Sequence, residues 1–345
     1  MPKFKIYKLH FTSPVHLGDT REDYGISLKT ISSDTLYAAL TSCLAKIGKQ
    51  IPNNGDLGFT ISSLFPFYQQ DKESKAVYFL PKPLKSELPN LKDVENAKAI
   101  KKVQWIDIDD FSDFLNGKAN IGDKSELIKG DYFVSKAHLI VGKDDKGKDV
   151  AFDNKFIDTK VSPRVTVSRT GQEDAIPFYM DRVYFKDHSG LFFLVEGDTK
   201  LLDIAIDILQ YEGVGTDRNV GNGFFEYNKL SKSEIEINYP DDSEYVISLS
   251  MYIPENKQQL DGMLAGENVA YDFIRRGGWI TTPPHISFRK NAIYAFTPGS
   301  IFSAEANQPF IQGKIHDLKP ELDFDSRIEH PIWRNGKSIF IPIKL

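Results

Sequence analysis

The chain has 345 residues, of which 41% are hydrophobic and 26% are charged, with a formal net charge of -5. Such a chain can bury more than one core, so its length favours two domains and its composition excludes a disordered protein. Its single cysteine, Cys43, excludes an internal disulfide and a multi-cysteine zinc site, and the small negative charge gives no global nucleic-acid signature.

The first part of the chain predicts the order strand, helix, strand. Residues 3–12 alternate between apolar and polar side chains, which is typical of a strand. Residues 33–48 carry an apolar stripe at helical spacing, and Ser33 or Asp34 would cap the helix. Residues 75–84 follow as a short strand that two prolines end.

Residues 85–150 are less regular and indicate an insertion between core strands. They hold a candidate basic helix (ENAKAIKKVQWI, 95–106), a short acidic and aromatic helix (DDFSDFLNG, 109–117) and a polar turn (GKDDKGKD, 142–149).

A long β-hairpin is predicted over residues 155–190. Its arms are VSPRVTVSR (161–169) and FYMDRVYF (178–185), and GQEDA (171–175) supplies the turn. We assign the hairpin to about residues 155–188.

A second strand, helix and strand follow the hairpin. GLFFLVEG (190–197) predicts a short buried strand, residues 198–210 a helix, and FFEYNKL (224–230) a strand. The helix is expected to bury one stripe: Leu201, Ile204 and Ile208. The resulting order is the βαββαβ order of a ferredoxin-like (RRM-like) domain.

The same order is expected again after a boundary near residues 231–234. The predicted elements are a strand at 245–254, a helix at 255–266 and strands within 271–280, 288–300 and 336–343. We therefore predict an α+β fold of two tandem ferredoxin-like domains, residues 1–232 and 233–345, with the insertion and the hairpin in the first.

The apolar runs of the chain are short. The segment MPKFKIYKLHF lacks the apolar region of a signal peptide, and runs such as LFFLV (191–195) are too short to cross a bilayer. We expect a cytoplasmic protein with no membrane partner.

The glycine-rich loop GVGTDRNVGNGFF (213–225) raises the main functional question. A dinucleotide-binding fingerprint needs a third glycine where Arg218 stands and a helix after the loop, and a P-loop needs a lysine that is missing. Two interpretations remain: a wide turn that needs positive φ, or backbone amides and Arg218 that hold phosphates of an extended strand.

Other candidate motifs are weak. His16 is a lone histidine in a loop and is more often structural than catalytic, and no histidine cluster has metal-ligand spacing. Local basic stretches at 155–169 and 271–290 are usually solvated faces, but arginine beside aromatic residues is also how proteins hold single-stranded RNA.

Eight motifs occur in one order along the chain: SPVHLG, SSDTLYAAL, FLPKP, KKVQWI, PRVTVSR, GLFFLVEG, GVGTDRNVGNGFF and EHPIWRNGKSIFIPI. This ordered set resembles the fourth Csm subunit of type III-A CRISPR-Cas effector complexes, a RAMP protein of the Cas-five group. The resemblance covers about residues 5 to 343.

The resemblance implies a non-catalytic subunit that binds the 5′ repeat-derived tag of the crRNA. It also implies contacts with the large polymerase-like Csm subunit and with the backbone RAMP Csm subunit. It implies no catalytic residue, no metal and no cofactor. The implied RNA contacts are His16, Gly18, Arg164, Arg169, Gly213, Gly215, Arg218, Gly221 and Gly223. Ser33 is expected to cap its helix.

Two other functions stay open on sequence grounds. A metal-independent crRNA-processing endoribonuclease would use His16 as general acid or base, although the sequence shows no placed partner for it. In a pure protein-interaction module, the basic stretches would be ordinary surface.

Overall fold

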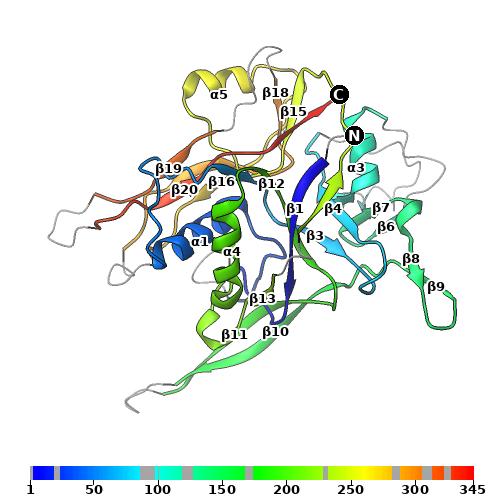
Figure 1. Ribbon diagram of the computed structural model, residues 1–345, viewed down its shortest axis with the longest axis horizontal. Helices are drawn as coiled ribbons and strands as arrows, with labels where there is room; N and C mark the ends of the chain where they lie inside the picture. Colours follow the sequence, from blue (N-terminus) through cyan, green and yellow to red (C-terminus); the bar gives the residue numbers. More distant parts are fainter. Residues whose placement is uncertain are drawn as a thin grey trace.

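The largest element of the fold is a ten-stranded sheet (Figure 1). The computed structural model describes residues 3–18, 24–85, 98–99, 101–118, 127–167, 174–227, 232–281, 288–304, 313–321 and 328–345. Within them, the sheet runs in the order β13 (Phe225–Glu226), β1 (Lys3–Phe11), β12 (Gly190–Gly197), β3 (Phe65–Tyr68), β4 (Val77–Pro81), β5 (Trp105–Asp107), β7 (Tyr132–Val134) and β6 (Leu127–Lys129). β14 (Lys232–Glu236) also pairs with β1, and β2 (Phe59–Ile61) with β12. The mixed α+β class is confirmed.

Strand β1 lies between β12 and the two short strands β13 and β14, and it contributes apolar side chains to both faces of the sheet. It is antiparallel to β12, with Ile6 opposite Leu194 and Tyr7 opposite Phe193. Since successive side chains point to opposite faces, Ile6 enters one hydrophobic cluster and Tyr7 the other. A sheet covered on both faces explains why β12 has a continuous apolar sequence.

Two helices cover one face of this sheet. α1 (Ser33–Lys46) and α4 (Lys200–Glu212) pack against each other, as the sequence predicts helices there. The predicted stripe of α4 is right only in part. Leu201 and Ile208 are half-buried against the core, but Ile204 is exposed, and the fully buried apolar residues are Leu202, Ala205, Ile206 and Leu209. Both stripes fit helical spacing, and only the position of the sheet selects one of them.

The predicted insertion extends the same sheet through β5, β7 and β6. Residues 98–99 and 101–102 are helical, but Trp105 and Ile106 belong to β5, so the predicted helix does not reach them. The acidic and aromatic helix is confirmed as α3 (Ile108–Leu115), which turns its aromatic residues into the core. A 3-10 turn, η1 (Lys136–His138), precedes β8 (Ile140–Lys143) and β9 (Asp149–Ala151), and the predicted polar turn joins these two strands.

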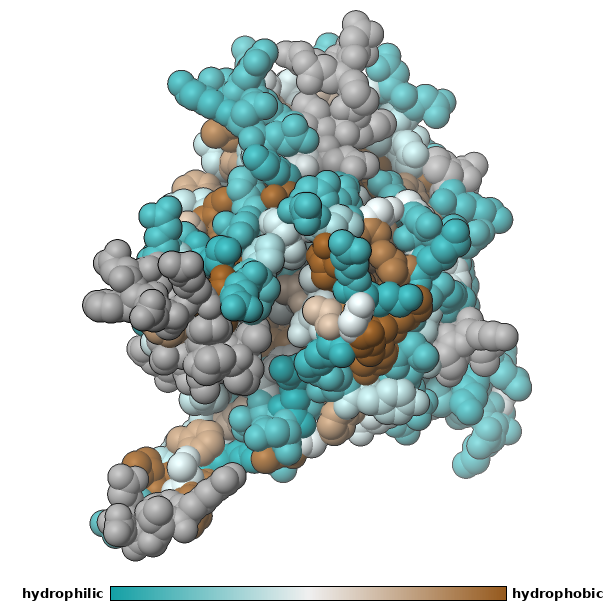
Figure 2. Space-filling model, turned by 60° about the vertical axis from the view of Figure 1, so that its left-hand side comes forward, coloured by the Kyte–Doolittle hydropathy of each residue, from teal (hydrophilic) through white to brown (hydrophobic). Residues whose placement is uncertain are grey.

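The hairpin forms as predicted from β10 (Ile157–Thr166) and β11 (Ile176–Phe185). It projects at the bottom of Figure 1, and Figure 2 shows hydrophobic residues on the surface of this projection. The exposed hydrophobic residues of the hairpin are Val161, Val165, Val167, Ile176, Tyr179 and Tyr184. Residues 171–173 of the predicted turn lie outside the described residues.

The C-terminal part contains β15 (Tyr245–Ser248), which lies between β18 (Ile301–Ser303) and β21 (Phe340–Ile343). The predicted strand at 245–254 is therefore shorter than expected, and the predicted helix is α5 (Lys257–Met263). Two ribbons complete this part: β16 (Phe273–Arg276) with β17 (Ile293–Phe296), and β19 (Ile315–Asp317) with β20 (Trp333–Asn335). Among the described helices, none has the length and apolar character that spanning a membrane would need.

The N-terminal and C-terminal parts share one hydrophobic cluster. Ile6 and Phe192 of the large sheet belong to it together with Ile247, Ile301 and Ile341 of the C-terminal strands. The chain therefore buries the second face of the large sheet against its own C-terminal part.

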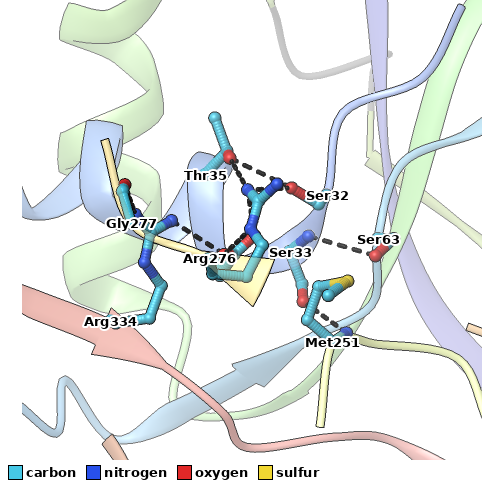
Figure 3. Close-up of polar contacts among 9 residues, drawn as sticks. Ser32, Ser33, Thr35, Ser63, Met251, Arg276, Gly277 and Arg334 are labelled. Atoms are coloured by element: carbon cyan, nitrogen blue, oxygen red, sulfur yellow. Dashed lines mark hydrogen bonds and ion pairs between the residues drawn. The ribbon is translucent and has the colours of Figure 1, made fainter. Parts of the chain in front are cut away.

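Polar bonds join the two parts at the N-terminus of α1 (Figure 3). The prediction that Ser33 caps the helix is wrong, because Ser32 occupies the N-cap. The Ser33 hydroxyl instead accepts the Met251 N–H at 2.9 Å, and the Ser33 N–H donates to Ser63 Oγ at 3.0 Å.

Asp34, the second predicted cap, is fully buried and binds two arginines of the C-terminal part. Arg276 donates through Nε and Nη2 to its two carboxylate oxygens at 2.8 and 3.0 Å, and Arg334 Nη1 donates to Oδ2 at 2.7 Å. Burial alone would raise the pKa of Asp34, but the guanidinium groups of Arg334 and Arg276 lower that pKa from 3.8 to about 2.

We expect Asp34→Asn to lower the free energy of unfolding by about 3 kcal/mol, because two largely buried guanidinium groups lose their counter-ion. Chemical denaturation at neutral pH measures this. Asp113→Asn is the matched control, since Asp113 is exposed and 3.7 Å from Lys118, and it should cost less than about 1 kcal/mol.

The pH dependence gives the same test a second readout. Because folding lowers the pKa of Asp34, its stabilisation is fully present above about pH 4 and is lost as the pH falls towards 2. The difference between wild type and Asp34→Asn should shrink over that window. A constant difference would contradict the ion-pair role.

Candidate nucleic-acid interface

The glycine-rich loop connects the end of α4 to β13 and folds back on itself. The Val214 N–H donates to the Gly223 carbonyl at 2.9 Å, and the Gly223 N–H donates to the Pro14 carbonyl at 2.8 Å. Between the glycine pairs lies a short 3-10 turn, η2 (Arg218–Val220), flanked by Asp217 and Gly221 in left-handed conformations. The loop is thus a compact structure bound to the segment that follows β1.

Glycine is required where the loop approaches that segment. Gly215 has φ of +85°, and a Cβ there would lie 2.3 Å from the His16 carbonyl oxygen. The same oxygen accepts the Thr216 N–H at 3.0 Å and the Thr216 hydroxyl at 3.2 Å. At Gly223, a Cβ would lie 1.9 Å from the Val214 carbonyl oxygen.

Several amides of the loop are already bonded within the protein. The N–H groups of Gly213, Gly221 and Gly223 donate to the carbonyls of Leu209, Arg218 and Pro14. In this conformation these three glycines do not present free donors to a phosphate. Their predicted phosphate contact through backbone amides is therefore not supported, and the spacing of the glycines is explained by the turn.

His16 contacts the glycine-rich loop through its backbone carbonyl, and its side chain is buried. Its side chain is 1% exposed, and Nδ1 donates to the Asp181 carbonyl of β11 over 2.7 Å. The predicted RNA contact by this imidazole is not supported, because burial separates it from any ligand. The contribution of His16 is structural: its backbone carbonyl accepts hydrogen bonds from the N–H and the hydroxyl of Thr216.

The base of the hairpin completes the arrangement. Val15 and Val183 exchange backbone hydrogen bonds at 3.0 and 2.8 Å, and the Ser27 N–H donates to Asp181 Oδ2 at 3.0 Å. The loop after β1 therefore lies between the hairpin and the glycine-rich loop. Gly18, at the outer end of that loop, is exposed.

Two arginines flank the glycine-rich loop, each near one carboxylate. Arg164 Nη1 of β10 lies 3.8 Å from Asp217 Oδ2, and Arg218 Nη1 lies 3.9 Å from Glu212 Oε2, which Lys46 also contacts. Arg218 is 42% exposed at its side chain. Ion pairs this long and this exposed are weak, so a phosphate can replace the carboxylate as the arginine's partner.

The structure therefore brings together the predicted residues His16, Gly18, Arg164 and Arg218 with the four glycines, although they come from three distant segments. Arg169 lies outside the described residues. Sequence reasoning missed Pro14, Thr216, Asp181 and Asp217, which hold the segments together. The polar sequence TDRN, residues 216–219, gave a signal for Thr216 and Asp217 but none for Pro14 and Asp181.

A model of the Csm4 C-terminal domain family matches residues 241–343. The CRISPR system Cms protein Csm4 of Streptococcus thermophilus is 23% identical over 357 residues, which cover 99% of both chains. The protein of the same name from Methanocaldococcus jannaschii is 24% identical over 312 residues, 78% of this chain and 79% of that one.

Solved structures resemble the whole chain. A Csm3–Csm4 subcomplex of the type III-A CRISPR-Cas interference complex contains a chain with TM-score 0.61 and 20% identity, and 100% of both chains is covered. A Csm1–Csm4 cassette in complex with pppApA contains one with TM-score 0.56 and 21% identity, covering 100% of this chain and 99% of that one. These likenesses show the fold.

We predict different costs for alanine at two glycines of the loop. Gly221→Ala meets no atom within 4 Å and should lower the free energy of unfolding by about 1 kcal/mol through its positive φ alone. Gly215→Ala adds the clash with the His16 carbonyl and should cost clearly more, with faster hydrogen exchange at the Thr216 amide. Equal costs and unchanged exchange would show that the two segments do not hold each other.

Proposed function

Because this chain resembles Csm4 subunits of CRISPR systems along its whole length, we propose that it is the RNA-binding structural subunit of a type III-A effector complex. The similarity to Csm4 confirms the resemblance that the ordered motifs predicted. In the proposed role the chain holds the 5′ repeat-derived tag of the crRNA.

The convergence of three segments supports the RNA-binding role. The glycine-rich loop, the loop after β1 and the hairpin base form one continuous surface, and Arg164 and Arg218 flank it. Arginines that position phosphates, with unstacked bases held by nearby side chains, are typical of single-strand recognition. The arginines carry more of the contact than the glycine amides do, because the amides of Gly213, Gly221 and Gly223 are bonded within the protein.

The partners follow from the relatives. Csm4 chains occur in structures with Csm1 and with Csm3. We propose that this chain likewise joins a large polymerase-like subunit to a backbone RAMP subunit in the cytoplasm. Such a bridge needs two separate faces, which a chain of two packed parts can supply.

We also propose the tandem ferredoxin-like organisation. The first βαβ unit consists of β1, α1 and β3, and the second consists of β12, α4 and β13. In the large sheet β12 lies between β1 and β3, and β1 lies between β13 and β12. The two strands of each unit are therefore separated by a strand of the other unit, as in a ferredoxin-like domain. In the C-terminal part, β15 lies between β18 and β21. The division predicted between residues 232 and 233 falls within β14, which pairs with β1 along its whole length, so we move the proposed boundary to the end of β14, after Glu236.

In this proposal the chain is not an enzyme. The endoribonuclease alternative needs the His16 imidazole within reach of an RNA, and that side chain is buried against Asp181. The chain would act by position and charge alone.

We expect Arg218→Ala to weaken binding of a tag-containing RNA and to reduce the slope of log affinity against log salt by about 0.7, the value for one phosphate contact on a single strand. A filter-binding series on the purified full chain over several salt concentrations measures the slope. Lys200→Ala, at the opposite end of α4 and highly exposed, is the charge-matched control. An unchanged slope in Arg218→Ala would rule out the phosphate contact.

We expect the purified chain to leave a repeat RNA intact in metal-free buffer, because the His16 imidazole, the general acid or base that the alternative requires, is buried. Gel analysis after prolonged incubation measures this. Cleavage that disappears in His16→Gln, with an unchanged melting temperature, would establish the endoribonuclease instead.

A further inference from the structure

A second surface with RNA-binding chemistry lies on the ribbon of β16 and β17, away from the glycine-rich loop. In its antiparallel register Phe273 is opposite Phe296, and Arg275 is opposite Tyr294. Since alternate residues share a face, these four side chains lie on one side of the ribbon. Ile274 and Ala295 lie on the other side, where they pack with Met251 and Ile253.

The aromatic side of this ribbon is open to solvent. Tyr271 is 45%, Phe273 52% and Tyr294 62% exposed. Contiguous exposed aromatic surface is unusual in a soluble chain and marks a place where something binds.

The rings are held in position by one another. The Phe273 and Tyr294 rings meet edge to face with centroids 5.7 Å apart, and the Tyr271 and Phe273 rings stack at 6.4 Å. Tyr271 and Phe273 both rest on Phe296, at 5.3 and 6.4 Å. A surface ordered in advance loses little conformational entropy when it binds.

The charged side chains along this ribbon are mainly cationic. Arg275 is exposed beside Tyr294, and the Arg289 guanidinium lies 4.9 Å above the Trp279 ring, at a bridge that continues the ribbon. Arg276 turns away to Asp34. Within the described residues 271–281 and 288–297, the only carboxylate is Asp272. The face therefore complements a polyanion.

We propose that the aromatic face of β16 and β17 is a stacking platform for single-stranded RNA, with bases on Tyr294 and Phe273 and a phosphate at Arg275. Exposed aromatic rings interleaved with guanidinium groups on a β-surface provide base stacking without sequence preference. This site goes beyond the proposed tag-binding function, because it lies in the C-terminal part and uses none of the residues of the glycine-rich loop.

The experiment uses the full chain and a 12-nucleotide oligouridine that contains 4-thiouridine and no tag sequence. Crosslinked peptides should map to residues 271–297. Tyr294→Leu should weaken binding roughly tenfold, because stacking on an aromatic ring is lost while apolar volume remains. Tyr294→Phe keeps the ring and should bind like wild type.

Arg275→Gln tests the phosphate contact without altering the rings, so it serves if Tyr294→Leu fails to fold. It should reduce the salt slope by about 0.7. Lys146→Gln, in the exposed turn between β8 and β9, is the matched control and should leave the slope unchanged.

The possible results separate this proposal from the tag-binding function. Oligouridine affinity that is unchanged in both Tyr294→Leu and Arg275→Gln would overturn the platform. If those variants instead lose co-purification with another subunit while RNA binding persists, the face binds protein and the proposal is wrong. Arg218→Ala should leave the crosslinks at residues 271–297 in place whether or not it affects binding of the tag RNA.

Discussion

A buried carboxylate, Asp34, fixes the arrangement on which the rest of the molecule depends. It binds Arg276 and Arg334 from two different ribbons of the C-terminal part, so it sets the position of α1 relative to both. α1 packs on α4, and α4 ends where the glycine-rich loop begins. A buried ion pair of this kind adds little net stability over apolar packing, but it penalises every arrangement that separates the charges. We infer that this ion pair specifies how the two parts of the chain pack against each other.

The sequence predicted best those elements whose residue pattern favours one type of secondary structure. The near-alternation in β1 and the short apolar run of β12 between two glycines both favour strands, and both strands were confirmed. The prediction of the buried stripe of α4 was only partly right, because two neighbouring stripes satisfy the same helical spacing. Arg276 stood in a basic stretch that reads as surface, and only the fold reveals that it points inward to Asp34. Contacts between residues more than two hundred positions apart leave no local signal.

The candidate site shows the same limit at closer range. Glycine spacing correctly indicated a loop with positive φ, and the structure adds the reason, which is the close approach to the His16 carbonyl at Gly215. The sequence could not show which amides are already bonded within the protein, nor that the His16 ring is buried. The bond from Gly223 to Pro14 and the burial of the His16 ring against Asp181 both join segments that lie far apart in the sequence. They move the expected contact from backbone amides to arginine side chains.

The pairing of β1 has a consequence for how the protein behaves in a crowded cell. One side of β1 is occupied by two short strands, β13 over His10 and Phe11 and β14 over Lys3 to Tyr7. The resulting sheet edge is divided into two pieces, and Lys232, Glu234 and Glu236 place charges along the longer one. Short, charged edges resist pairing with strands of other chains, which is the first step of aggregation. The chain is thereby protected from self-association at this edge.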